Sequence, residues 1–329
     1  MPWKGETDPY KVWLSEVILQ QTRVEQGWAY YEKFINHYPA VSLLAAAKDE
    51  DVFKLWEGLG YYSRCRNLLF TARFITKELK GNFPDTYKDI LQLKGVGPYT
   101  AAAIASFCFN LPHAVVDGNV IRVLARVYGI QKSAASNEGK KYFERKAFEN
   151  LSQKKPGLYN QAIMDFGATV CKPQLPLCSK CVMQKICVAY REDKVDAYPV
   201  KEKALIKRQR WFNYFILQVK EKTFVRPRTE KDIWQGLYEY ALYESATEIT
   251  WNKKNILQYL EKEMGVSGAE SVSICEAKPQ QLTHQFIRGC FIKVKLISMP
   301  SSLRNGEWLT QAELAKKAFP KFINGNAVG

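Results

Sequence analysis

Two carboxylates stand in sequence settings that could share the work of an acid and a base. Glu16 lies in the segment Tyr10–Thr22, where its helical neighbours are mostly apolar. An acid on such a face either lies at a domain edge or is partly desolvated, and desolvation favours its protonated form. Asp117 follows an apolar run and precedes a helical pattern, so it can cap a helix whose N-terminus favours a negative charge. A proton donor beside an ionised carboxylate can break a glycosidic bond. On local sequence alone, an ordinary helix cap is the simpler interpretation of Asp117.

Four cysteines crowd into a short loop. Cys171, Cys178, Cys181 and Cys187 follow the spacing C-x6-C-x2-C-x5-C. Zinc ribbons generally place about 15 to 20 residues between two cysteine pairs, whereas iron-sulfur clusters accept compact and uneven spacings. The spacing therefore favours a [4Fe-4S] cluster, with zinc and incidental cysteines as the alternatives.

A glycine-containing turn could bind a phosphate. Gly95 and Gly97 lie between two helical patterns, and Pro98 suits the first turn of the second helix. Such a turn points unpaired N–H groups and a helix dipole at an anion without reading a base sequence. We expect a helix-hairpin-helix that binds DNA phosphate, and a plain turn between two helices is the alternative.

These residues need a scaffold that is mainly helical. Apolar residues recur three and four apart, with breaks at Gly, Pro or Asn. The pattern predicts helices over 10–22, 28–37, 43–47, 50–58, 63–80, 87–93, 99–109, 120–129, 140–151 and 159–170. The basic stretch 191–210 indicates a linker. Strands are expected at 211–219 and 289–298, and helices at 252–264 and 311–318. The predicted domains are a helical domain at 1–190, with the cysteine loop at 171–187, and a smaller α+β domain at 211–329.

Composition and charge narrow the class of partner. The 329 residues are 47% hydrophobic and 25% charged, which excludes disordered, collagen-like and coiled-coil chains. The net charge of +15 favours nucleic acid over other partners. No apolar run approaches the length of a membrane span, and the first residues form no secretory signal. We therefore expect an intracellular, cytoplasmic protein without a membrane partner, acting as a monomer.

Together, these motifs resemble the adenine DNA glycosylases of the MutY family. The resemblance rests on Trp3, Pro9–Glu16, Leu19–Thr22, Gly58–Tyr62, Gly95–Gly97, Val116–Val120 and the cysteine loop, and it weakens after Arg210. It implies excision of adenine mispaired with 8-oxoguanine or guanine in double-stranded DNA, as part of base excision repair. The implied fold is a two-lobed helix-hairpin-helix glycosylase with a [4Fe-4S] cluster, followed by a Nudix-like domain. Members usually carry a further helical segment before the position of Trp3.

The resemblance also implies roles for individual residues. Glu16 would protonate the leaving adenine, and Asp117 would stabilise or attack the sugar cation, with support from Tyr99 and Asn119. The adenine pocket would include Trp3, Lys4, Leu19 and Gln161, with lysine at position 4 where arginine is usual. The residues that match positions contacting the duplex are Gln20, Gln21, Thr22, Leu59 and Tyr61, for which helix-end packing or a solvated face is the local alternative.

Two further positions separate the possible activities. Related endonuclease III enzymes carry a lysine where this chain has Tyr99, and a phenol cannot form their Schiff base. The resemblance therefore implies a monofunctional glycosylase rather than a bifunctional glycosylase-lyase. The lesion-sensing Phe-Ser-His loop aligns with Phe286–Arg288, and Ile287 offers no hydrogen bond there. Recognition of 8-oxoguanine would then rest on His284, Gln285 or Arg288, with Phe286 as a further residue that contacts DNA. A DNA-binding protein without catalysis is the third alternative, which the presence of both Glu16 and Asp117 opposes.

Overall fold

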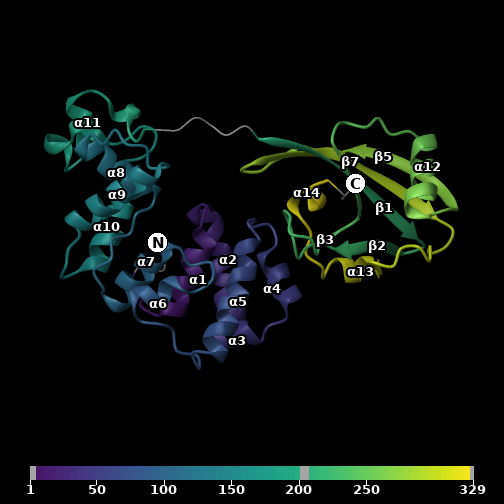
Figure 1. Cartoon of the computed structure of the whole chain (residues 1–329), viewed down its shortest axis with the longest axis horizontal. Helices are drawn as coiled ribbons and strands as arrows, with labels where there is room; N and C mark the ends of the chain where they lie inside the picture. The colour runs from purple at the N-terminus through teal and green to yellow at the C-terminus, as the bar shows by residue number, and fades with distance from the viewer. Residues whose placement is uncertain (1–4, 201–206, 327–329) are drawn as a thin grey trace. The chain divides into compact units, whose positions relative to one another are not determined.

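The computed structural model describes residues 5–200 and 207–326. The chain divides into two compact units, one formed by Met1–Ala46 and Arg66–Ala204 and the other by Ala47–Cys65 and Leu205–Gly329. Each unit is coloured by residue number in Figure 1. Within the described residues, no helix is both long enough and apolar enough to span a bilayer.

The first unit is helical, as the periodicity predicts. Its helices, with α5 crossing the unit boundary, are α1 (Pro9–Leu19), α2 (Val24–His37), α3 (Val41–Ala46), α5 (Ser63–Lys77), α6 (Tyr87–Leu91), α7 (Pro98–Phe109), α8 (Gly118–Tyr128), α9 (Asn137–Asn150), α10 (Pro156–Thr169) and α11 (Val188–Arg191). Short 3-10 turns follow α10 at Cys178–Lys180 and Gln184–Ile186, and another follows α11 at Val195–Ala197. Helices α1 and α7 are buried over most of their length and pack against each other.

The second unit contains a mixed sheet between helices. Its elements are α4 (Asp49–Trp56), β1 (Arg208–Val219), β2 (Lys222–Pro227), β3 (Tyr238–Glu239), β4 (Ala241–Ser245), α12 (Lys253–Met264), β5 (Ala269–Glu276), β6 (Gln280–Gln281), β7 (Gln285–Leu296), β8 (Glu307–Thr310), α13 (Gln311–Leu314) and α14 (Lys321–Asn324). The main strand order is β3-β2-β1-β7-β5, and β1 and β7 run parallel from the pair Arg208 and Gln285 onward.

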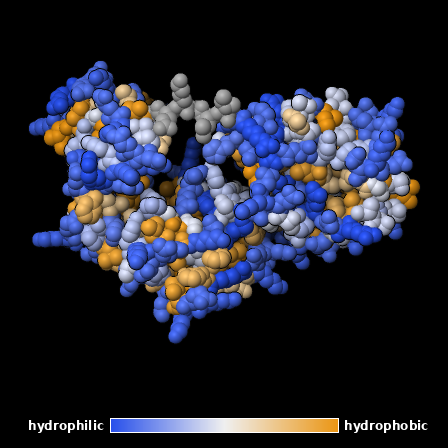
Figure 2. Space-filling view, in the orientation of Figure 1, coloured by the Kyte–Doolittle hydropathy of each residue, from blue (hydrophilic) through white to orange (hydrophobic). Residues whose placement is uncertain are grey.

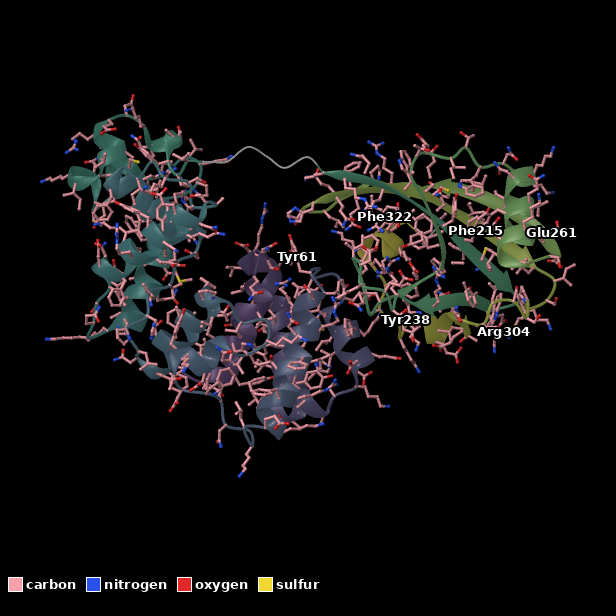
Figure 3. The ribbon with its side chains drawn as sticks, in the orientation of Figure 1. Tyr61, Phe215, Tyr238, Glu261, Arg304 and Phe322 are labelled. Atoms are coloured by element: carbon pink, nitrogen blue, oxygen red, sulfur yellow. The ribbon has the colours of Figure 1, made fainter. Side chains whose placement is uncertain are left out.

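Side chains along β1 point alternately to the two faces of the sheet, and each face carries its own hydrophobic core. Tyr214 contributes to a cluster with Phe322 of α14, whereas Phe215 contributes to a cluster with Ile256 of α12. Phe215 and Phe322 are labelled in Figure 3. Helix α12 therefore covers one face, and α13 and α14 cover the other.

The segment Ala47–Cys65 groups with the C-terminal residues, which differs from the expected helical domain at 1–190. Polar contacts explain the difference. The backbone N–H of Phe319 donates to Glu57 Oε1 at 2.8 Å, and Lys54 Nζ donates to the carbonyl of Lys317 at 3.0 Å. Strand β1 also begins at Arg208, inside the expected linker at 191–210.

Candidate active site

Glu16 is a buried acid on α1. Asp8 caps this helix by accepting hydrogen bonds from the backbone N–H groups of Tyr10 and Lys11, and Pro9 occupies the first turn. The helix is enclosed on nearly all sides, which leaves Glu16 only 6% exposed. This burial raises the pKa of Glu16 to about 7, against the opposing effect of a hydrogen bond from Tyr99. The desolvation expected from the sequence is thus present.

Tyr99 connects the proton donor to α7. It lies in the first turn of that helix, directly after Pro98, and its hydroxyl donates a hydrogen bond to the Glu16 carboxylate. Burial and the negative charges of Glu16 and Asp117 raise the pKa of Tyr99 well above its ordinary value. The phenol therefore stays protonated and serves as a hydrogen-bond donor.

Asp117 caps α8, as its sequence position predicts. One carboxylate oxygen accepts from the backbone N–H of Val120 at 2.7 Å, and the other accepts from Asn119 Nδ2 at 2.7 Å. The negative charge of Asp117 adds to the rise in the Glu16 pKa, so the two carboxyl groups interact electrostatically. The structure thereby brings together the four residues that the resemblance places in catalysis.

Arg122 is a residue of this site that the sequence interpretation did not anticipate. Its Nη2 donates to Asn119 Oδ1 at 2.9 Å and to the carbonyl of Gly167 at 2.6 Å, and its Nε donates to the carbonyl of Cys171 at 2.7 Å. The guanidinium thus orients the amide that in turn orients Asp117. The spacing of three residues between Asn119 and Arg122 on one helix was the available signal.

A cavity of about 600 Å³ adjoins Glu16. Its polar lining includes Glu6, Glu16, Gln161 and Asp165, and Phe107 adds an aromatic side chain. A volume of this size is within the range of pockets that enclose small ligands. Gln161 thus lines the same cavity as Glu16, and Asp165 is a further lining residue that the sequence interpretation did not name.

The residues that follow α1 adopt a compact turn. Leu19 packs against Gly27, and Gln20 donates from Nε2 to Thr100 Oγ1 at 3.2 Å. Gln21 is exposed with a positive φ of 56°, and Thr22 Oγ1 donates to the carbonyl of Gln20 at 3.4 Å. Gln21 is thus presented outward, whereas Gln20 is held against α7.

The expected hairpin joins α6 and α7. Gly95 has a φ of 84°, and a Cβ there would lie 2.7 Å from the Cβ of Asn67, so both conformation and space favour glycine. Gly97 caps α7 and has open space where a side chain would stand. The turn thus ends at the N-terminus of a twelve-residue helix, where the helix dipole favours an anion.

The four loop cysteines line one small cavity of about 20 Å³. Burial and the proximity of the other three thiols raise the pKa of Cys178, and Arg126 Nη1 donates to Cys171 Sγ at 3.5 Å. No group of three or more His, Cys, Asp or Glu side chains within 5–200 and 207–326 meets the geometry of a metal site. The thiols therefore converge on one place without reaching ligating geometry in this structure.

The loop that contains Leu59 and Tyr61 belongs to the second unit. Leu59 is only 5% exposed, which fits helix-end packing, whereas Tyr61 is 45% exposed and has a φ of 49°. Trp56 Nε1 and Arg64 Nη2 both donate to the carbonyl of Gly60. The Tyr61 hydroxyl, labelled in Figure 3, hydrogen-bonds that of Thr283 at 2.8 Å. The loop thus presents Tyr61 in a fixed conformation.

The predicted lesion-sensing residues lie at the start of β7. Ile287 is fully buried in the sheet core, which places Phe286 and Arg288 on the opposite face. The Arg288 guanidinium lies 4.9 Å from the Phe286 ring centroid and 5.6 Å from that of Trp211. His284, just before the strand, is exposed. Trp3 and Lys4 fall outside the described residues.

The face of the molecule shown in Figure 2 is mainly hydrophilic, with scattered apolar patches. Within the cysteine loop, Leu175 and Val182 are both 87% exposed. Such side chains are ordinary when isolated, so they mark no additional site by themselves.

Comparisons with known proteins show the chain's relatives. The model of the HhH-GPD superfamily of base excision DNA repair proteins matches residues 14–152. The adenine DNA glycosylase of Buchnera aphidicola subsp. Acyrthosiphon pisum (strain APS) is 36% identical over 261 residues, which cover 77% of this chain and 73% of that protein. The adenine DNA glycosylase of Homo sapiens is 43% identical over 198 residues, covering 57% of this chain and 36% of that protein.

Solved structures show the same fold in the helical part. A thermostable thymine-DNA glycosylase has a TM-score of 0.54 and 31% identity, covering 58% of this chain and 88% of that chain. Endonuclease III in a non-covalent DNA complex has a TM-score of 0.51 and 20% identity, covering 56% of this chain and 86% of that chain. The second likeness concerns the fold alone.

Proposed function

Because the chain belongs to the family of adenine DNA glycosylases, we propose that it hydrolyses the bond between adenine and deoxyribose in double-stranded DNA. The observation that carries this proposal is the interaction of three groups, of which Glu16 lines a cavity. Glu16 is buried with a pKa of about 7, Tyr99 donates to it, and Asp117 lies close enough to raise that pKa further. The activity places the protein in base excision repair.

The reaction divides between the two carboxyl groups. Glu16 donates its proton to the adenine ring, and the electron pair of the C1′–N9 bond leaves with the base. The Asp117 carboxylate stabilises the positive charge that develops on the sugar, while Asn119 and Val120 hold it in place. Water then adds to C1′ and completes the hydrolysis. Since Tyr99 has no amine, the strand stays intact and the enzyme is monofunctional.

The target adenine must leave the helix to reach this cavity. Flipping costs a few kcal/mol, which phosphate contacts and inserted side chains can offset. The Gly95–Gly97 turn is suited to a phosphate, while the exposed Gln21 and Tyr61 are suited to entering the duplex. Gln161 lines the cavity that would receive the flipped base. The protein acts in this scheme as a monomer.

We further propose that the partner base is 8-oxoguanine or guanine. His284, Phe286 and Arg288 carry this discrimination, because the burial of Ile287 leaves its neighbours to face a ligand. The sheet covered by α12 on one face and by α13 and α14 on the other is consistent with a Nudix-like domain.

The four cysteines fit a [4Fe-4S] cluster by donor type and by their common cavity. Cys171, Cys178, Cys181 and Cys187 would hold it through thiolates. When bound, the cluster supplies a covalent link that closes the loop between α10 and α11. Arg126 donates a hydrogen bond to Cys171. The main catalytic steps require only the residues near Glu16.

The test is excision of adenine from a duplex in which adenine stands opposite 8-oxoguanine or guanine. Alkali should be required to break the strand at the excised site. Breaks before alkali would identify a lyase, and binding without breaks would identify a protein without catalysis. Glu16→Gln and Asp117→Asn should each lower the single-turnover rate by at least about 100-fold, as expected for loss of a catalytic acid or a charge-stabilising group.

A further inference from the structure

Gln161 and Asp165 lie one helical turn apart on α10 and line the same cavity as Glu16. Gln161 Nε2 donates to Asp165 Oδ1 at 3.1 Å. The residues of α10 that face away from the cavity anchor the helix, because the buried Asn160 side chain bonds Ser106 Oγ and the backbone of Val115 and His113. The pair therefore stands on a fixed part of the cavity wall.

The chemistry of this pair determines which end of the amide meets a ligand. An ionised carboxylate only accepts hydrogen bonds, so it pairs with the NH₂ group of a glutamine and not with the carbonyl. With Nε2 bonded to Asp165, Gln161 offers Oε1 as the remaining group. Within the described part of the chain, no donor bonds that oxygen. The cavity thus presents a hydrogen-bond acceptor at this position.

We propose that Asp165 is a positioning residue that selects a 6-aminopurine by fixing the orientation of the Gln161 amide. This inference rests on the proposed function and adds a cause for its base specificity. Adenine carries a 6-amino donor, which pairs with Gln161 Oε1. Hypoxanthine and guanine carry a 6-oxo acceptor, which would face another acceptor. Removing such a mismatch requires turning the amide, and Asp165 opposes that turn.

The experiment compares excision of adenine and hypoxanthine from otherwise identical duplexes by the full chain, under single-turnover conditions. Asp165→Asn removes the fixed orientation, because asparagine can donate to Oε1 or accept from Nε2. The ratio of adenine to hypoxanthine excision should fall about tenfold, the value of one hydrogen bond in a pocket of this kind. A folded Asp165→Asn protein with the wild-type ratio would overturn the proposal.

A double variant separates orientation from support of the fold. Asp165→Asn combined with Gln161→Glu places a carboxylate at position 161, which accepts in every orientation and can receive a hydrogen bond from the introduced asparagine. The adenine preference should return to within about threefold of the wild-type ratio. If the preference stays low in the double variant, Asp165 acts only through packing and the proposal is wrong.

Two further variants complete the design. Glu6→Gln removes another carboxylate from the same cavity, but Glu6 bonds the backbone of Thr7 and Asp8 and the side chain of Lys11, not Gln161. Its ratio should match the wild type whatever its absolute rate. Gln161→Leu should lose the adenine preference even if Asp165→Asn does not fold, and retention of the preference would overturn the proposal. A wild-type protein that excises neither base contradicts the proposed function itself.

Discussion

The hydroxyl of Tyr99 donates a hydrogen bond to the carboxylate of Glu16, and so joins the start of α7 to the proton donor of α1. The bond favours the charged form of the acid, while burial and the charge of Asp117 favour the neutral form. Burial is the largest of these influences, and the resulting pKa of about 7 suits a group that must give up a proton near neutral pH.

The rate of adenine excision should depend on the protonation of Glu16. Single-turnover rates are expected to fall about tenfold per pH unit above about pH 7, where the acid loses its proton. Tyr99→Phe removes the hydrogen bond that lowers this pKa, so the alkaline decline should move to higher pH. A pH profile of both proteins measures the effect, and a shift of the decline to lower pH would contradict it.

The burial of Glu16 should also make the free energy of unfolding fall as the pH rises. Because the folded-state pKa of Glu16 is raised, the folded protein holds its proton more tightly than the unfolded chain between pH 4.5 and about 7. Folding stability should therefore decline across this interval, by about 3 kcal/mol in total from this group. Glu16→Gln should remove most of the decline. Denaturant unfolding at pH 5 and pH 8 provides the comparison, and equal pH dependence in both proteins would refute the assignment.

The same substitution can be compared at the two glycines of the hairpin between α6 and α7. Gly95→Ala should destabilise the protein by about 1 to 3 kcal/mol, because the new Cβ would meet Asn67 and the φ of 84° disfavours alanine. Gly97→Ala meets no atom within 4 Å and should cost less than about 1 kcal/mol. Thermal unfolding of the two variants tests this ranking. Equal losses of stability in the two variants would contradict it.

Removal of a loop cysteine should release iron. Cys178→Ser is expected to lower iron content and visible absorbance in anaerobically purified protein, because one of four thiolate donors is lost. Cys275→Ser is the control, since Cys275 is exposed and lies in β5, outside the loop. Iron retained equally in both variants, or zinc in the wild-type protein, would exclude the proposed cluster.

Local sequence predicted the features that depend on neighbours along the chain. The desolvated position of Glu16, the cap at Asp117 and the turn at Gly95 all follow from residues within a few positions. The burial of Ile287 was not predicted, because an apolar residue near a strand start can face either solvent or core. Asp165 also escaped notice, since a carboxylate four residues after a glutamine is common on exposed helices.

The grouping of α4 with the sheet unit has a consequence for dividing the protein. Glu57 and Lys54 precede the linker by more than a hundred residues, yet their partners are Phe319 and Lys317 near the other end of the sequence. An N-terminal fragment that ends within the linker would contain α4 but would lack the C-terminal residues that α4 contacts. A cut in the linker therefore divides the second unit itself, and an exchange of C-terminal halves between relatives must preserve the contacts that Lys54 and Glu57 make.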